Sequence, residues 1–106
     1  MADVRITVDR DQLTILITVM DTVLQDNVRG EGLNIIWSIV ERMIVRFRQR
    51  HAVKRIDYAI ILTVYQALAL RRMAIAGQEF LSDQRQVNEL RLFLMHLDPK
   101  LTQYTT

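Results

Sequence analysis

Five segments of the chain carry a regular spacing of apolar residues, and each spacing predicts a secondary-structure element. Residues 4–8 alternate between apolar and polar side chains, which is the period of a half-buried strand. Residues 11–28 and 33–50 instead place apolar side chains three and four positions apart, as on one face of a helix. Helical spacing also runs through 57–76 and 83–97. The pattern therefore predicts an extended arm followed by four helices.

The arm at residues 4–8 cannot form a sheet alone, and the sequence leaves two arrangements open for it. In the first, the arm lies against the helices of its own chain. In the second, it pairs with the same segment of a second chain, because an unpaired strand edge offers free backbone groups to any neighbour.

Polar, glycine and proline residues mark the expected ends of the helices. A carboxylate or hydroxyl before a helix accepts hydrogen bonds from the free amides of the first turn, and glycine after a helix favours a left-handed terminal position. The expected caps and stops are Asp9 or Asp11 before the first helix, Gly30 and Gly32 after it, Gly77 after the third, and Ser82 and Pro99 around the fourth.

The boundary between the second and third helices is the hardest to place, because no glycine or proline interrupts residues 33–76. One continuous helix over that range is one interpretation. Helices in globular proteins average about 11–12 residues, so a helix of about forty residues is rare in a compact domain. We therefore place a turn within 51–56 and begin the third helix at Asp57.

Length and composition restrict the fold class. A chain of 106 residues is sufficient for one domain with one hydrophobic core. Hydrophobic residues make up 50% of the chain, which excludes intrinsic disorder. Three glycines and one proline supply too few tight turns for a small sandwich or barrel. We therefore expect a single all-α domain over residues 1–106, arranged like a four-helix bundle and preceded by the short N-terminal arm.

Cysteine usage and the N-terminal residues bear on the compartment. The chain has no cysteine, which excludes disulfides and cysteine-ligated zinc and agrees with a reducing environment. Its first residues lack the basic-then-apolar order of a signal peptide. The longest nearly apolar run, 58–70, is shorter than the roughly 20 residues that a membrane span needs. We expect a cytoplasmic protein without a transmembrane segment.

Side chains suited to catalysis or to metal binding are sparse. Neither His51 nor His96 has a serine or carboxylate at a spacing that specifies a catalytic triad. The Glu-x-x-His motif of di-iron bundles does not occur, and Gly30-Glu-Gly32 is too short for a phosphate-binding loop. We expect no catalytic residues, no metal and no cofactor, and therefore a protein that is not an enzyme.

Positive charge is concentrated between residues 42 and 55, where no acidic residue occurs. Within this tract Arg42, Arg46 and Arg50 follow one another at helical spacing and form one ridge of guanidinium groups, which suit carboxylates and phosphates. The expected anion-binding residues are Arg42, Arg46, Arg48, Arg50, Lys54 and Arg55. The competing interpretation is a solvated helix end whose cations offset the helix dipole.

The third predicted helix is apolar on almost every side, and a helix of this kind must be covered on every side. A second copy of the chain would cover it, with small side chains allowing close approach of the two backbones. The expected self-association residues are Ala59, Leu62, Thr63, Ala67 and Leu70. Alternatively, this helix is the central one and is enclosed by the rest of its own chain. We expect a homo-oligomer, with a dimer favoured.

A short internal similarity accompanies these patterns. Ile17-Thr-Val-Met20 and Leu62-Thr-Val-Tyr65 resemble each other 45 positions apart, each within the first helix of a predicted hairpin. Four similar positions give slight support to two stacked helical hairpins.

These features predict a function in binding. We expect a small helical interaction protein, such as an adaptor, assembly factor or regulator, that self-associates and presents the arginine ridge to an acidic protein partner. The alternative is a nucleic-acid-binding regulator whose arginines contact backbone phosphates, which give affinity and salt dependence but no sequence readout.

Overall fold

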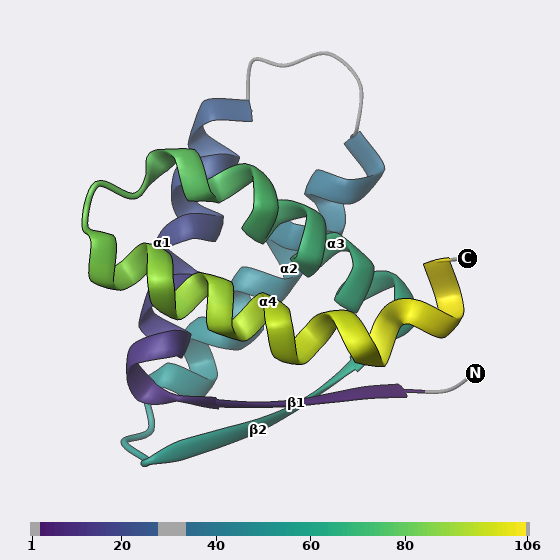
Figure 1. Ribbon diagram of the computed structural model, residues 1–106, viewed down its shortest axis with the longest axis horizontal. Helices are drawn as coiled ribbons and strands as arrows, with labels where there is room; N and C mark the ends of the chain where they lie inside the picture. Colours follow the sequence, from purple (N-terminus) through teal and green to yellow (C-terminus); the bar gives the residue numbers. More distant parts are fainter. Residues whose placement is uncertain (1–2, 28–33, 106) are drawn as a thin grey trace.

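The structure of the chain is a computed structural model that describes residues 3–27 and 34–105 (Figure 1). Within those ranges four α-helices and a two-stranded sheet account for most of the chain. The elements are β1 (Asp3–Asp9), α1 (Arg10–Asn27), α2 (Asn34–His51), β2 (Asp57–Thr63), α3 (Val64–Gly77), the 3-10 turn η1 (Gln78–Phe80) and α4 (Gln84–Thr105). The glycines expected to end the first helix, Gly30 and Gly32, lie outside the described residues.

The N-terminal arm is a strand, as the alternation at 4–8 predicts, and its partner lies within the same chain. β1 pairs antiparallel with β2, so that Val4 lies opposite Leu62 and Val8 opposite Tyr58. Along both strands alternate residues are buried, and the remaining ones face outward and are exposed except for the half-buried Ala59. We call this two-stranded sheet the ribbon.

The prediction of a helix from Asp57 is wrong for its first seven residues, because 57–63 form β2. Tyr58, Ile60 and Leu62 share the inward face of the ribbon and are almost completely buried there. The two other apolar residues, Ala59 and Ile61, lie on the outward face and conceal the alternation in the sequence. The apolar composition of this segment therefore no longer requires a second chain.

Each strand passes directly into a helix, and a reciprocal pair of hydrogen bonds fixes each transition. The Asp9 carboxylate accepts from the Gln12 amide at 2.7 Å, and the Gln12 side chain accepts from the Asp9 amide. Thr63 and Gln66 make the same exchange at the start of α3. Such capping boxes satisfy amide groups that otherwise lack a partner at a helix start. Of the two predicted caps for the first helix, Asp9 is the one observed.

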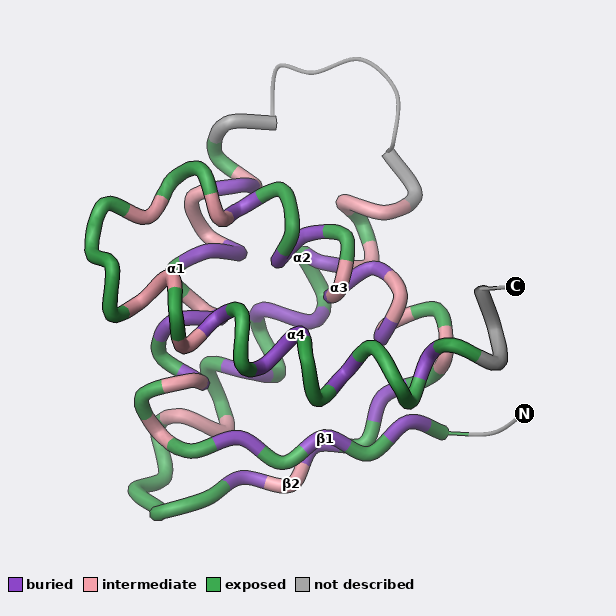
Figure 2. Tube along the Cα trace, in the orientation of Figure 1, coloured by how far each residue is buried: buried purple, intermediate pink, exposed green. Residues whose placement is uncertain are grey.

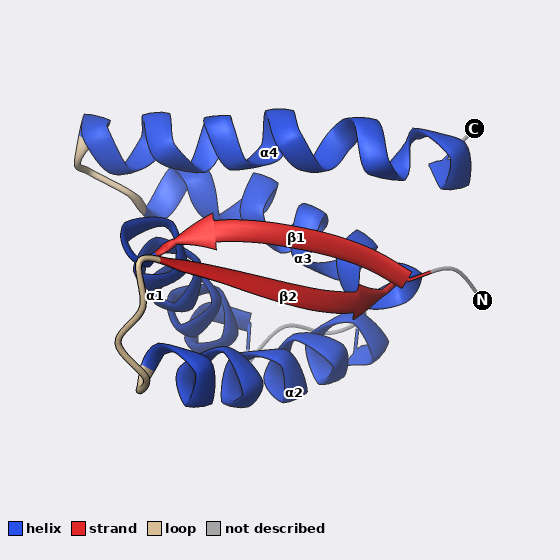
Figure 3. Ribbon diagram, turned by 90° about the horizontal axis from the view of Figure 1, so that it is seen from below, coloured by secondary structure: helices blue, strands red, loops and turns tan. Residues whose placement is uncertain are grey.

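The hydrophobic core lies between the ribbon and helices α1 and α3, while α2 and α4 flank it (Figures 2 and 3). Its largest fully buried side chains come from every strand and helix except β1, and include Phe47 of α2 and Leu97 of α4. Seen from the ribbon side, α2 and α4 run along opposite edges of the two strands. No helix in the described part of the chain is long and apolar enough to cross a membrane.

A turn separates α2 from β2 at residues 52–56, where the sequence predicts one, so the interpretation as one long helix is wrong. At α4 the predicted ends are wrong. Asp83, not Ser82, caps the helix by accepting from the Arg85 amide at 2.9 Å. The helix also continues through Pro99 to residue 105, and the buried side chain of Leu101 packs against the core beyond the proline.

Gly77 ends α3 for a different reason from the predicted one. Its backbone has the right-handed helical conformation, with φ of −75° and ψ of −13°, so no left-handed position is required. The residue is buried, and a Cβ placed on it would lie 2.0 Å from Cγ1 of Val19 on α1. Glycine is therefore needed because α3 approaches α1 closely.

The two halves of the chain repeat one β-α-α pattern, and the repeats are related by an approximate two-fold axis through the ribbon. Ile6 lies opposite Ile60 in the ribbon, 54 positions later in the chain. Residues buried in α1 recur in α3 at that separation: Leu13 with Ala67, Leu16 with Leu70, Val19 with Met73, Met20 with Ala74, and Val23 with Gly77. Two-fold symmetry makes each segment pair antiparallel with the equivalent segment of the other repeat, as β1 and β2 do.

The second helices obey the same symmetry at a separation of 50 positions. Buried residues of α2 recur in α4, as Val40 with Leu90 and Phe47 with Leu97. Arg50 near the end of α2 donates to the Ala59 carbonyl of β2, and Lys100 of α4 donates to the Arg5 carbonyl of β1. The two helices thus hold opposite edges of the ribbon through equivalent contacts.

Candidate functional site

A pocket with a strongly cationic lining lies where α2, the turn 52–56 and the start of β2 meet. Its volume is about 330 Å³. We call it the cationic pocket, and its lining residues are Arg46, Gln49, Arg50, Val53, Arg55 and Tyr58. Among the residues that the structure describes, no acidic side chain is part of this lining. The structure thus brings together three of the six residues that the sequence predicts as anion-binding.

Helix geometry places two of the three guanidinium groups on one side of α2. Arg46 and Arg50 are four positions apart, so their side chains lie one above the other. Arg50 Nη2 donates to the Ala59 carbonyl at 2.7 Å, which fixes this guanidinium against the outer edge of β2. Arg50 lies in the last turn of α2, where the helix dipole favours positive charge, and Arg46 lies one turn earlier.

Tyr58 forms the floor of the cationic pocket and fixes the turn that carries the third arginine. Its side chain is fully buried, and its hydroxyl donates to the Val53 carbonyl at 2.6 Å. The same oxygen accepts from the Arg55 amide at 3.1 Å and from Arg10 Nη1 at 2.6 Å. One buried hydroxyl therefore fixes two backbone groups of the turn. Arg10, the first residue of α1, donates to that hydroxyl.

Side chains of α1 also form hydrogen bonds with the last residue of α2. Arg10 Nη1 also donates to the His51 carbonyl at 3.1 Å. The hydroxyl of Thr14 lies 2.9 Å from His51 Nε2, within hydrogen-bonding distance. These contacts make the wall of the cationic pocket rigid before any ligand binds, which reduces the entropy lost on binding.

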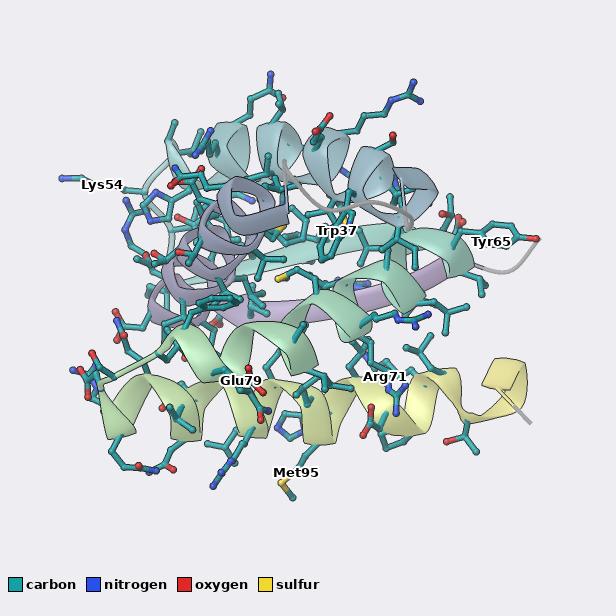
Figure 4. All side chains as sticks on the ribbon, turned by 90° about the horizontal axis from the view of Figure 1, so that it is seen from above. Trp37, Lys54, Tyr65, Arg71, Glu79 and Met95 are labelled. Atoms are coloured by element: carbon teal, nitrogen blue, oxygen red, sulfur yellow. The ribbon has the colours of Figure 1, made fainter. Side chains whose placement is uncertain are left out.

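The other three predicted residues lie outside the cationic pocket. Arg48 faces α1 and forms a 3.0 Å ion pair with Asp21. Arg42 is exposed one turn before Arg46 on the same ridge. Lys54 projects from the turn into solvent (Figure 4). Neither Arg42 nor Lys54 has an ion-pair partner among the described residues.

The five residues predicted for self-association do not form one surface. Ala59, Leu62 and Thr63 belong to β2 or its end, whereas Ala67 and Leu70 belong to α3. Leu62, Ala67 and Leu70 are 0% exposed within a single chain. The prediction requires all five residues to lie along one face of a single helix. Because residues 57–63 form β2, they do not.

Several residues of the site were not identified from the sequence. Tyr58 was assigned to a helix, and its pairing with Arg10 joins residues 48 positions apart, which no local pattern reveals. Val53 lies inside the basic tract but carries no charge. Among the described residues no group of three His, Cys, Asp or Glu side chains could hold a metal ion.

Removal of the Tyr58 hydroxyl is expected to destabilise the protein and to loosen the turn. Tyr58→Phe leaves the Val53 carbonyl, the Arg55 amide and the Arg10 guanidinium each without one hydrogen bond. We expect the free energy of unfolding, measured with urea, to fall by about 1–3 kcal/mol. Hydrogen exchange at the Arg55 amide should become faster.

The matched control is Tyr65→Phe, because Tyr65 is 64% exposed and its hydroxyl makes no hydrogen bond to the described residues. This variant should stay within about 0.5 kcal/mol of the parent protein. Equal stability of the two variants would contradict the role of the Tyr58 hydroxyl.

Comparisons of the chain with protein-family models, with curated proteins and with solved structures find no significant match. The residues and their geometry are therefore the basis for a functional proposal.

Proposed function

We propose that this protein is a non-catalytic interaction protein whose cationic pocket binds a short acidic segment of a partner protein. One observation carries the proposal: Arg46, Arg50 and Arg55 line one pocket, with no acidic side chain in the lining and no ion pair to any of the three among the described residues. Arg48, by contrast, lies outside the cationic pocket and is paired with Asp21.

The chemistry of the lining suits carboxylate groups. Each guanidinium offers several N–H donors in a planar fork that matches the two oxygens of a carboxylate. Arg50 uses one nitrogen for the Ala59 carbonyl, which orients the rest of its fork. Gln49 adds an amide group, and Val53 and Tyr58 add apolar surface beneath the charges. Bound carboxylates would therefore be partly shielded from water, where such contacts are stronger.

Charges around the cationic pocket favour a short acidic segment over nucleic acid. Asp57 lies opposite Asp9 at the end of the ribbon next to the pocket, and Asp3 occupies the other end of its outward face. Duplex DNA carries a negative charge about every 1.7 Å along its axis. Its backbone would extend past the pocket and be repelled by these carboxylates. A peptide can instead carry a short run of acidic residues that fits within the pocket.

Titration with a defined acidic peptide tests the proposal. The probe is a peptide of six glutamates, added to ¹⁵N-labelled protein at low ionic strength and followed by NMR. We expect shifts at the side-chain signals of Arg46, Gln49 and Arg55. Replacing both Arg46 and Arg55 by Ala should raise the Kd at least tenfold, because charge-assisted hydrogen bonds are worth about 1.5–3 kcal/mol each.

The control variant is Arg48→Ala, which removes one cation from the same helix but outside the cationic pocket, and its Kd should stay within twofold of the parent value. Equal weakening by Arg48→Ala would mean that only net charge matters and would overturn the proposal. A second arm uses a 20-base-pair DNA duplex. Tighter binding of the duplex, with an affinity that falls steeply as salt rises, would replace the acidic segment with nucleic acid.

A further inference from the structure

A second cavity, larger than the cationic pocket, lies between α2 and α3. Its volume is about 560 Å³, and Arg71 and Arg72 are the charged side chains that line it among the described residues. We call it the apolar groove. Its large apolar side chains are Ile36, Ile39, Tyr65, Leu68 and Ile75. Tyr65 is 64% exposed and Ile75 47%, so much of this apolar surface is open to solvent (Figure 4).

The two-fold relation between the halves shows that the fold does not require this apolar surface. Every large apolar residue of the groove has a polar counterpart in the other half of the chain. At the separations of 54 and 50 positions found above, the pairs are Tyr65 with Asp11, Leu68 with Thr14, Ile75 with Asp21, Ile36 with Gln86, and Ile39 with Glu89.

The counterpart surface brings three of these five polar residues together. Asp11, Thr14 and Gln86 line a smaller pocket of about 140 Å³ between α1 and α4. Two of its three charged side chains are paired with each other, since Asp11 binds Arg85 at 3.1 Å. The same scaffold is thus built with polar side chains in one half and with exposed apolar ones in the other. Exposed apolar surface concentrated in one place is typical of binding sites.

The apolar groove and the cationic pocket lie along one seam. The seam follows α2, with α3 beside its first half and β2 beside its second half. Ile39 of the groove and Arg46 of the pocket are two helical turns apart on α2, about 10 Å along the axis. A single peptide of about fifteen residues spans that distance as a helix.

The charged side chains of the groove are positive, as are those of the cationic pocket. Arg71 forms a 2.7 Å ion pair with Asp98, whereas Arg72 has no ion-pair partner among the described residues. In the described part of the chain, no acidic side chain lines either cavity. An occupant of the seam therefore meets apolar side chains with Arg72 among them in the groove, and three arginines in the cationic pocket.

We propose that the apolar groove binds the apolar face of an amphipathic helix from the partner protein, and that the acidic end of the same helix enters the cationic pocket. Leucine-like residues at spacings of three and four would contact Ile39 and Leu68, with acidic residues facing Arg72 and Arg46. This inference rests on the proposed function and adds the form of the bound segment to it.

The test uses fluorescein-labelled 18-residue peptides and fluorescence anisotropy. The composite peptide carries leucines at helical spacing in one half and glutamates in the other, and it is made in both orders. A second peptide keeps the glutamates and replaces the leucines by glutamine. We expect one order of the composite to bind at least tenfold more tightly than the glutamine peptide.

Substitutions copied from the other half provide the decisive variant. Tyr65→Asp combined with Leu68→Thr gives the groove the residues of its counterpart, which the scaffold already accepts at Asp11 and Thr14. In this variant the composite should bind no better than the glutamine peptide. Thr18→Ala, on the counterpart surface, is the control and should leave both affinities unchanged. Circular dichroism verifies that each variant folds.

Failure of this inference and failure of the proposed function give different results. If the composite and the glutamine peptide bind equally, and Arg46→Ala weakens both, the groove plays no part and the inference is overturned. If the composite binds through the groove but Arg46→Ala has no effect, the proposed function fails, and with it the link between the two cavities.

Discussion

Leu62→Glu is expected to unfold the protein largely, whereas Ile61→Glu, one position earlier, should leave it folded. Leu62 is 0% exposed on the inward face of the ribbon, so a glutamate there loses an apolar contact and buries an ionisable group. A loss of more than about 4 kcal/mol is expected, against total stabilities of about 5–15 kcal/mol. Circular dichroism during urea denaturation measures both variants.

The neighbouring substitution is the control because the strand turns successive side chains to opposite faces. Ile61 is 52% exposed and lies opposite Arg5 on the outward face, where a glutamate can pair with the guanidinium. We expect Ile61→Glu to change the free energy of unfolding by no more than about 0.5 kcal/mol. Similar damage from both substitutions would contradict the observed register of β2.

Local patterns identified the elements whose apolar spacing has a single interpretation. The alternation at 4–8 and the helical spacing at 11–28 and 33–50 predict β1, α1 and α2 to within one or two residues. Residues 57–63 carry apolar side chains on both faces, so no period is visible in them. The capping box formed by Thr63 and Gln66 is the one sequence signal that could have placed a helix start at Val64.

The structure contains an internal repeat of the β-α-α pattern, but the short sequence similarity indicates a different separation for it. The segments Ile17–Met20 and Leu62–Tyr65 are 45 positions apart, yet the first lies within α1 and the second crosses from β2 to α3. At the true separation of 54 positions, burial is preserved while residue identity mostly is not. Val23 and Gly77 are both buried, for example, although they differ greatly in size. Equivalent positions of the two halves therefore share their burial in the core but not their residue types.

Part of the candidate site can be predicted from local sequence, and the rest depends on contacts between residues far apart in the chain. The basic tract is a local feature of the sequence, and Arg46, Arg50 and Arg55 from it do line the cationic pocket. The support for that pocket is long-range, because Tyr58 comes from β2 and Arg10 from α1. The apolar groove also depends on contact between α2 and α3, so its lining could not be assembled from sequence spacing.

Gly77→Ala is expected to lower the free energy of unfolding by about 1–3 kcal/mol, the usual cost of overpacking a core. The added Cβ would lie 2.0 Å from Cγ1 of Val19, and it also approaches Val23 at 3.4 Å. Valine is stiff about χ1, so the Val19 methyl group cannot rotate away without strain. Urea denaturation of both forms gives the difference directly.

Val19→Ala provides the second half of a double-mutant cycle. It removes the methyl group that the new Cβ would meet, and on its own it should also destabilise the protein, because it leaves a small cavity beside Gly77. In the Val19→Ala background, Gly77→Ala fills that cavity and should be close to neutral. A coupling energy of about 1–3 kcal/mol between the two substitutions is therefore expected. Simple additivity of their costs would mean that α3 does not approach α1 closely at Gly77.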